Sequence, residues 1–305
     1  MTAITFQSLT TRRGALAALS AHLLVALIAL VGIGGATRVM EAGLACPDWP
    51  LCYGSLLPGQ QMNLQVFLEW FHRLDAFVVG MGLLVQAGAT WWWRQELPRW
   101  VPLLSSGALL LVAVQGALGA LTVTLLLPFP VVTAHLVTAL LLVALLSACT
   151  QALLQEPSPA AMAPAVRRSW LGRLWSPLLA LVLLLALGQC LLGGLMATQW
   201  AAGRCLSSGE ACSWLWAHRL GARPVALAVG AAVATAAVLR PADRPLAALA
   251  AAVVLAQIAL GVFSLRLTLA VPAVTVAHQL GAALLVAVLT ALFSRSLLRP
   301  LSEVP

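Results

Sequence analysis

The chain has 305 residues, of which 62% are hydrophobic and only 9% charged, and its mean hydropathy is +0.99. A soluble globular domain has about 25% charged residues, so this composition excludes that class and indicates an integral membrane protein. The net charge of +8 comes from arginines spread over several short loops, and we therefore expect no basic surface for nucleic acid.

Eight apolar runs are each long enough to cross a bilayer, which takes about 20 helical residues. "LPFPV" alone separates the third run from the fourth, and "TLAVP" the seventh from the eighth, so each pair should form a tight hairpin interrupted by proline. The sequence therefore predicts an all-α integral membrane protein with eight transmembrane helices. Their approximate bounds are 15–37, 66–93, 100–125, 131–154, 174–199, 213–238, 246–269 and 272–296.

The positions of the arginines predict how the chain crosses the membrane. In an eight-span arrangement most loop arginines fall on one side, and only Arg38, Arg204 and Arg266 fall on the other. Because cytoplasmic loops are enriched in Arg and Lys, we expect both termini in the cytoplasm. The basic start of the first run is typical of a signal peptide, but its apolar part exceeds the roughly 7–15 residues of a signal h-region. We therefore expect a retained first span.

Several segments occur twice or three times along the chain. "QGALGALTV" from Gln115 matches "QIALGVFSL" from Gln257, and "FHRLDA" at His72 matches "AHRLGA" at His218. The Gln-x-x-x-Gly spacing recurs from Gln189, whereas the first span has an apolar residue at that place. These matches predict an internal repeat, and the small residues would let neighbouring helices approach closely.

The loop "QEPSPAAMAPAVRRSW" divides the repeats. We expect two repeat-related four-helix bundles, in residues 1–156 and 174–305, joined by a cytoplasmic linker at 157–173. Because each bundle has an even number of spans, both would enter the membrane in the same sense.

Four of the five histidines lie near the outer ends of the second, fourth, sixth and eighth runs: His72, His135, His218 and His278. Because even-numbered spans run in the same direction, these side chains should form one layer. Two imidazoles on facing helices can hold a haem iron from both sides, with His72 paired to His135 and His218 to His278.

Two other roles for these histidines are hydrogen bonding between helices and binding of zinc. Their repeat-related positions favour haem, because a structural zinc site needs ligands clustered at short spacing. His22, which has no counterpart in the second half, is expected to be structural.

Charged residues accompany two of the histidines. Arg73 and Arg219 directly follow His72 and His218, and a guanidinium can bind a haem propionate through two parallel hydrogen bonds. The alternative is that these arginines reach towards lipid headgroups.

Glu69 precedes His72 by three residues on the same helix face, whereas Leu215 stands at the matching place before His218. This carboxylate could pair locally with Arg73, or it could act as an acid, a base or a stabiliser of developing positive charge.

Cysteines divide between outer loops and spans. Each outer pair can close a small loop in an oxidising compartment, either as a structural clip or to exchange electrons or thiols. Cys149 and Cys190 lie in spans and are expected to be packing residues. The outer pairs are Cys46 with Cys52 and Cys205 with Cys212.

The motifs "GGATRVMEAGLACPDWPLCYG", "EWFHRL", "TAHL", "WAHRL" and "VAHQL" occur in this order and resemble those of the haem A synthase family. The resemblance covers nearly the whole chain. It implies oxidation of a ring methyl of haem O to the formyl group of haem A, through an alcohol and a geminal diol. It also implies that His218 and His278 hold haem B, and that His72 and His135 form the haem O and haem A site with Glu69 beside the reacting methyl.

The resemblance also implies a location and partners. The protein would lie in a bacterial inner membrane with its haem sites towards the outer side. Candidate partners are haem O synthase, cytochrome oxidase assembly factors and an electron acceptor that the sequence does not identify. An alternative with the same histidine pairs is a dihaem b-type electron carrier without substrate turnover. A haem transporter is less favoured, because all four histidines share one layer.

Overall fold

The computed structural model describes residues 12–155 and 170–298. In these residues eight helices are long and apolar enough to cross a membrane, so the predicted all-α fold with eight spans is confirmed. Residues 157–169 of the expected linker lie outside the described part of the chain. The helices are α2 (Arg12–Val39), α3 (Leu64–Trp92), α4 (Trp100–Thr124), α5 (Phe129–Leu154), α6 (Trp170–Thr198), α7 (Ala201–Ser208), α8 (Cys212–Leu239), α9 (Arg244–Arg266) and α10 (Pro272–Leu298), with 3-10 turns at Gly59–Gln61 and Pro241–Asp243.

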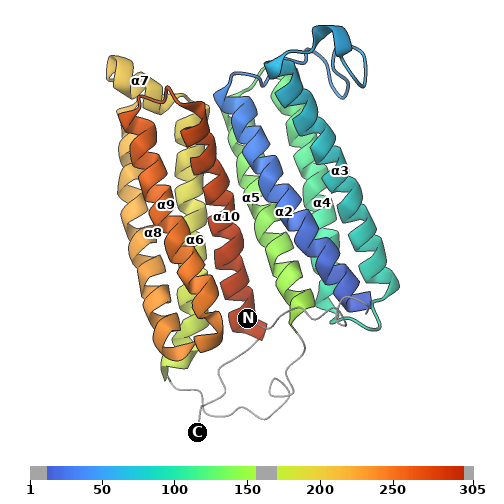
Figure 1. Ribbon diagram of the computed structural model, residues 1–305, viewed down its shortest axis with the longest axis vertical. Helices are drawn as coiled ribbons and strands as arrows, with labels where there is room; N and C mark the ends of the chain where they lie inside the picture. The colour runs from blue at the N-terminus through green and yellow to red at the C-terminus, as the bar shows by residue number, and fades with distance from the viewer. Residues whose placement is uncertain (1–11, 156–169, 299–305) are drawn as a thin grey trace.

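The long helices stand in two groups of four, α2 to α5 and α6, α8, α9 and α10 (Figure 1). The short helix α7, which the hydropathy pattern did not predict, lies across one end of the second group. We call this end, which also carries residues 40–63, the α7 end. Helix α10 packs against both α2 and α5, and Ser147 of α5 donates a 2.7 Å hydrogen bond to the carbonyl of Ala287 on α10. The two groups are therefore in direct contact.

Two large apolar cores fill the bundle, and the one centred on the first group also includes Ala283, Val286 and Ala287 of α10. Leu83, Val143 and Leu146 are fully buried in the first group, and Val182 and Leu289 in the second. Many large apolar side chains instead point outward from the bundle, as expected of a surface that contacts lipid.

Both expected hairpins form, and their first helices end in the same way. Leu127 after α4 and Leu269 after α9 adopt left-handed conformations, with φ of 60° and 62°. Their N–H groups donate to the carbonyls of Thr122 and Ser264 at 2.7 and 2.9 Å, which closes the last helical turn. A proline follows each turn and prevents continuation of the helix.

Candidate functional site

The four histidines lie within the first three turns of their helices, all at the α7 end, and all are half-buried. His22 is exposed on α2, where its Nδ1 is 2.6 Å from the carbonyl of Ala18. His22 is thus separate from the others. The four lie on different helices: His72 on α3, His135 on α5, His218 on α8 and His278 on α10.

The geometry of the second pair, His218 and His278, fits residues that would hold a haem iron from both sides. The rings of His218 and His278 have centroids 6.2 Å apart and planes at 87°. Two metal–imidazole bonds of about 2 Å each, together with the two ring radii, add to about that separation. No described residue forms a hydrogen bond to Nε2 of any of the four rings, so this nitrogen is available to iron in each.

Each ring packs against a glycine of the preceding long helix. A Cβ placed on Gly34 or Gly193 would lie 2.9 Å from Cε1 of the ring, too close for an unshifted side chain. The corresponding distance is 3.3 Å at Gly261, where the ring would have to shift slightly. It is 3.6 Å at Gly119, where an alanine would make an ordinary contact. The helices at the first two positions therefore approach too closely for a larger residue. The contacts are Gly34 to His72, Gly119 to His135, Gly193 to His218 and Gly261 to His278.

Glutamine side chains also reach from one helix to the next at this level. The Nε2 group of Gln115 donates to the carbonyl of His135 and to Oγ1 of Thr138, both at 2.9 Å. The Nε2 group of Gln189 donates to the carbonyl of His218 at 2.7 Å and lies 3.1 Å from its Nδ1. The repeated Gln-x-x-x-Gly spacing was the signal for these residues, but the sequence did not indicate that their amides touch the proposed ligands.

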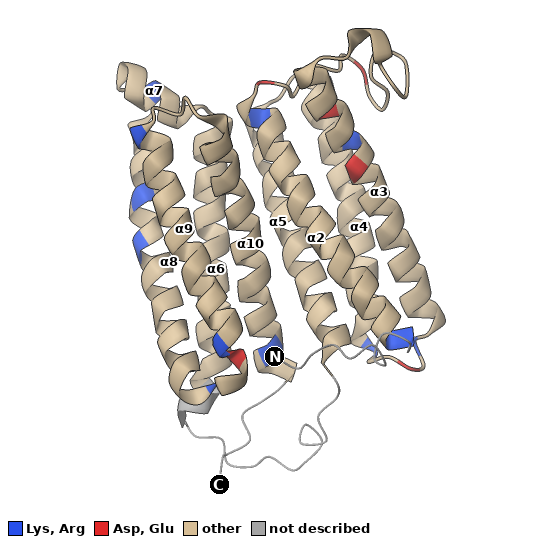
Figure 2. Cartoon of the chain, in the orientation of Figure 1, with Lys and Arg blue, Asp and Glu red and all other residues tan. Residues whose placement is uncertain are grey.

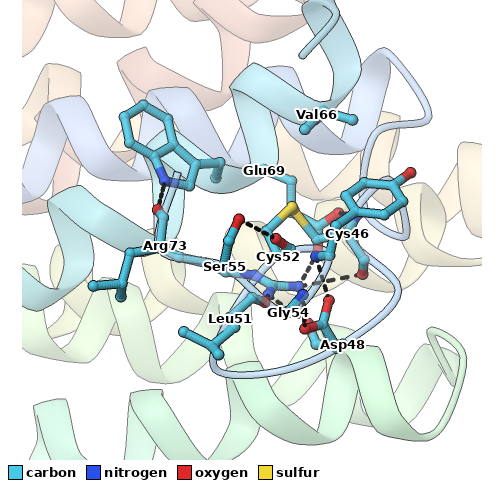
Figure 3. The surroundings of a disulfide bond; sticks show 12 residues. Cys46, Asp48, Leu51, Cys52, Gly54, Ser55, Val66, Glu69 and Arg73 are labelled. Atoms are coloured by element: carbon cyan, nitrogen blue, oxygen red, sulfur yellow. Dashed lines mark hydrogen bonds and ion pairs between the residues drawn. A yellow bond between two sulfur atoms is a disulfide. The ribbon is translucent and has the colours of Figure 1, made fainter. Parts of the chain in front are cut away.

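Glu69 is the buried acid of the site, with 4% of its surface exposed. Asn63 caps α3 by accepting the Val66 N–H at 3.0 Å, which places Glu69 on the second turn. One carboxylate oxygen accepts a 2.5 Å hydrogen bond from Arg73, and the other accepts the N–H of Cys46 at 2.8 Å (Figure 3). The local pair that the sequence offered as one interpretation is therefore formed.

Arg73 also ties the loop to the helix. Its Nη1 group donates to the carbonyls of Asp48 and Leu51, both at 2.6 Å, and Nη2 donates more weakly to that of Cys46 at 3.5 Å (Figure 3). The guanidinium thus binds three loop carbonyls and the Glu69 carboxylate. Its proposed contact with a propionate stays a prediction.

Both outer cysteine pairs form disulfides. Cys46 and Cys52 are almost completely buried, at 0% and 2% exposure, and pack with Val66. Cys205 and Cys212 connect α7 to the start of α8 and are half-exposed. The first disulfide is therefore inaccessible to a partner's thiol in this conformation, whereas the second is not.

Arg219 has surroundings unlike those of Arg73. It is exposed on α8, and its guanidinium carbon lies 5.0 Å from the centroid of the Trp216 ring. No described carboxylate or carbonyl accepts a hydrogen bond from it. Asp75 is half-buried on α3 and has no hydrogen bond or ion pair with a described residue. Cys149 is buried, with Gln86 Nε2 donating to its sulfur at 3.4 Å, as suits a packing residue.

Within residues 12–155 and 170–298, no three His, Cys, Asp or Glu side chains lie together in a group that could hold a metal ion. Structural zinc sites in proteins have four such ligands. A porphyrin iron takes only its axial ligands from the protein, so histidine pairs suffice for haem.

Comparison with known proteins identifies relatives over most of the chain. The COX15-CtaA family model, described as cytochrome oxidase assembly protein, matches residues 17–290. Heme A synthase from Shewanella oneidensis is 32% identical over 220 residues, which is 65% of this chain and 61% of that protein. The enzymes of the same name from Sphingopyxis alaskensis and Methylorubrum populi are both 31% identical, over 44% and 61% of this chain and 46% and 55% of their own. The chain spans about half to three fifths of the length of these relatives.

Proposed function

The chain belongs to the COX15-CtaA family of cytochrome oxidase assembly proteins, and we propose that it oxidises haem O to haem A. The names of its relatives support this activity. The observation that carries the proposal is that a buried carboxylate, Glu69, accompanies one histidine pair and not the other. Leu215 occupies the matching place on α8 and is itself buried, so the second pair has no acid there.

The two pairs then have different roles. His218 and His278 would hold a haem B cofactor, which supplies electron transfer when bound. His72 and His135 would hold the substrate haem O and, after reaction, the product haem A. The separation of the His218 and His278 rings leaves room for an iron between them and supports this role.

The reaction converts a ring methyl to a formyl group in two oxidations. The first replaces a C–H bond by C–OH, and the second gives a geminal diol that loses water to leave the aldehyde. With water as the source of oxygen, each oxidation takes up one water molecule and releases two protons and two electrons, and an acceptor must take the electrons. The protein's task is to bind the porphyrin in one orientation and to provide charge beside the reacting carbon.

Glu69 suits this task because its hydrogen bonds hold the carboxylate in place. Arg73 and the Cys46 N–H each occupy one carboxylate oxygen, and each oxygen retains a second lone pair. The free lone pairs can accept the hydroxyl proton of the alcohol or the diol, or stabilise positive charge on the carbon. The carboxylate is fixed before the substrate arrives, so it does not need to reorganise during the reaction.

Propionate binding differs between the two arginines. Arg219 is the better candidate, because its guanidinium contacts only the Trp216 ring among the described residues. Arg73 can bind a propionate only by sharing a guanidinium that already holds the loop. The haem of the second half would therefore depend more on its arginine than the haem of the first.

We further propose that both termini face the cytoplasm of a bacterial cell and that the α7 end faces outward. The distribution of arginines supports this orientation. The arginines at the other end of the bundle, away from the α7 end, are Arg12, Arg13, Arg94, Arg99, Arg240, Arg244 and Arg295. Haem O synthase and cytochrome oxidase assembly factors are the expected partners.

Extraction of the haems tests the function. The protein is expressed with a haem O synthase in a host that lacks its own haem A synthase, and its haems are separated by chromatography. Haem A or the alcohol intermediate, together with haem B, is the expected result. Haem B alone would contradict the proposal and favour the dihaem electron carrier.

A further inference from the structure

At three of the four proposed ligands, a glutamine from the preceding long helix packs against the helix that carries the histidine. We call this contact the glutamine clamp. Each clamp residue lies four positions before the glycine that packs on the histidine ring. The clamp therefore belongs to the same helix–helix contact as the ligand. The clamps are Gln115 of α4 against α5 near His135, Gln189 of α6 against α8 near His218, and Gln257 of α9 against α10 near His278. Gln257 clamps by packing alone, because its Nε2 has no hydrogen-bond partner.

The clamp joins two helices at the level of the ligand. Gln115 and Gln189 donate to the carbonyl of the histidine residue itself, which uses the second lone pair of a helical carbonyl. The amides of Gln189 and Gln257 also occupy the space that a Cβ on Gly221 or Gly281 would fill. Because few water molecules compete inside a membrane bundle, these contacts restrict both rotation and separation of the two helices.

His72 has no such clamp. The residue four positions before its glycine is Leu30, which is buried in the apolar core of the first group. The residue three positions after His72 is Asp75. At the same place after the other three histidines stand Thr138, Gly221 and Gly281. Among the described residues no side chain donates to the carbonyl of His72. Its buried Nδ1 has no hydrogen-bond partner, which is also true of His135 and His278.

The hydrogen bonds that hold α3 near His72 go mainly to the loop before α3. Thr37 of α2 donates to the carbonyl of Leu68 at 3.4 Å, a long bond one turn nearer the α7 end. The strong contacts are those of Glu69 and Arg73, and they connect α3 to the disulfide loop (Figure 3). At His72, α3 packs against Gly34 of α2, but its strong hydrogen bonds go to the loop and no glutamine of α2 reaches it.

We propose that His72 is the exchangeable axial ligand, the one that releases iron when the substrate porphyrin enters and the product leaves. This inference rests on the proposed function, because it takes the four histidines as iron ligands. A substrate must leave after each turnover, whereas a cofactor stays. In the first half the clamped His135 keeps hold of the porphyrin while His72 opens, and in the second half both ligands are clamped.

Haem transfer from full-length protein with one site intact tests this proposal. H218A/H278A leaves the first site and H72A/H135A leaves the second. Both proteins are loaded with haem B and mixed with excess apomyoglobin, and the transfer is followed by absorbance. We expect release from the first site to be at least about 10-fold faster, the lower end of the range for loss of a group that orients a metal ligand.

Exchanging the clamp between the halves sharpens the test. Leu30→Gln with Asp75→Gly introduces the α6–α8 pair of residues beside His72 and should slow release from the first site about 10-fold. Gln189→Leu removes a clamp and should speed release from the second site about 10- to 100-fold. Gln199→Leu is the matched control. Gln199 directly follows α6 and donates to the carbonyl of Leu195 on that helix, so its loss should change neither rate.

Equal release from the two sites, or rates that both exchanges leave unchanged, would overturn the proposal. If a double-alanine protein does not fold, the measurement is made on the otherwise intact protein, where Gln189→Leu should merge the slow phase of transfer into the fast one. Persistence of two unchanged phases would equally overturn it. The test does not require haem A to form, so haem extraction judges the proposed function separately.

Discussion

The two halves carry the same His-Arg pair after a disulfide-closed loop, yet they use it differently. In the first half the loop folds onto α3, and Arg73 and Glu69 bind its backbone. In the second half the disulfide connects α7 to α8, and Arg219 remains exposed beside Trp216. The comparison teaches that a repeated motif can serve different roles when its neighbouring residues differ, here chiefly Glu69 against Leu215.

The charges differ in the same way. Near the α7 end, α3 carries both acidic and basic residues, whereas the corresponding part of α8 carries only basic ones (Figure 2). A charge inside an apolar span is costly, about 2.5–3.5 kcal/mol on insertion scales. Glu69 on α3 is kept within a network of hydrogen bonds with Arg73 and the Cys46 N–H, which compensates its charge. A buried carboxylate that takes part in chemistry needs such partners.

The largest expected effect comes from Glu69→Gln, which keeps the shape and removes the charge. Haem A formation should fall about 10²- to 10⁴-fold, the usual contribution of a general acid or base, while the haem content of the protein is retained. Chromatography of extracted haems measures both quantities. Leu215→Met is the matched change in the second half and should leave conversion intact. Normal haem A yield from the Glu69 variant would remove the basis for its role.

The second largest effect is expected on stability, where replacing Arg73 should cost more than replacing Arg219. Arg73→Ala leaves a carboxylate buried and unpaired, which costs about 3–5 kcal/mol. Arg219→Ala removes an exposed side chain and should cost about 1 kcal/mol or less. Thermal unfolding in detergent compares the two variants. Similar midpoints for both would mean that the Arg73 network does not stabilise the fold, contrary to its buried position.

Removal of the two disulfides should have similar effects on stability but different effects on haem A yield. The sequence separations of 6 and 7 residues imply a similar entropic stabilisation, about 2 kcal/mol in each case. Replacing Cys46 and Cys52 by serine should also displace the N–H that Glu69 binds and so lower haem A yield. The same change at Cys205 and Cys212 should affect stability alone. Equal yields from the two double variants would contradict the coupling between loop and carboxylate.

The smallest effects are expected at the glycines beside the rings. Gly193→Ala should displace the His218 ring and lower the haem B content several-fold, because its Cβ would lie 2.9 Å from the ring. Gly119→Ala should be tolerated, since the corresponding distance is 3.6 Å. The absorption spectrum of the purified protein reports haem content. Equal loss in both variants would show that ring contact is not the deciding factor.

Much of the fold could be predicted because membrane spans depend on local composition. The runs at 15–37 and 272–296 correspond to α2 and α10, and each observed helix extends a few residues beyond its hydrophobic run. Helix α7 was missed because its eight residues mix alanine with polar groups and follow no long apolar pattern. The repeat relationship between the halves and the cytoplasmic position of the termini remain predictions.

The candidate site was predictable in its residue types but not in its contacts. Repeat spacing singled out the histidines, the cysteine pairs and the unmatched Glu69, because these features recur or fail to recur along one chain. The partners of Arg73 could not be read in this way, since three of them are backbone carbonyls, which every residue possesses. Only the folded loop decides which carbonyls face the guanidinium.

The sequence by itself determined that this chain is a membrane protein with eight helices and four histidines near one end, because hydropathy and periodicity act over short distances. The tertiary structure decided that the first loop closes over Glu69 and that three of the four proposed ligands are clamped by glutamine. The clamps depend on how closely α4 approaches α5, α6 approaches α8 and α9 approaches α10. That closeness arises from packing between residues far apart in sequence, which local patterns do not encode.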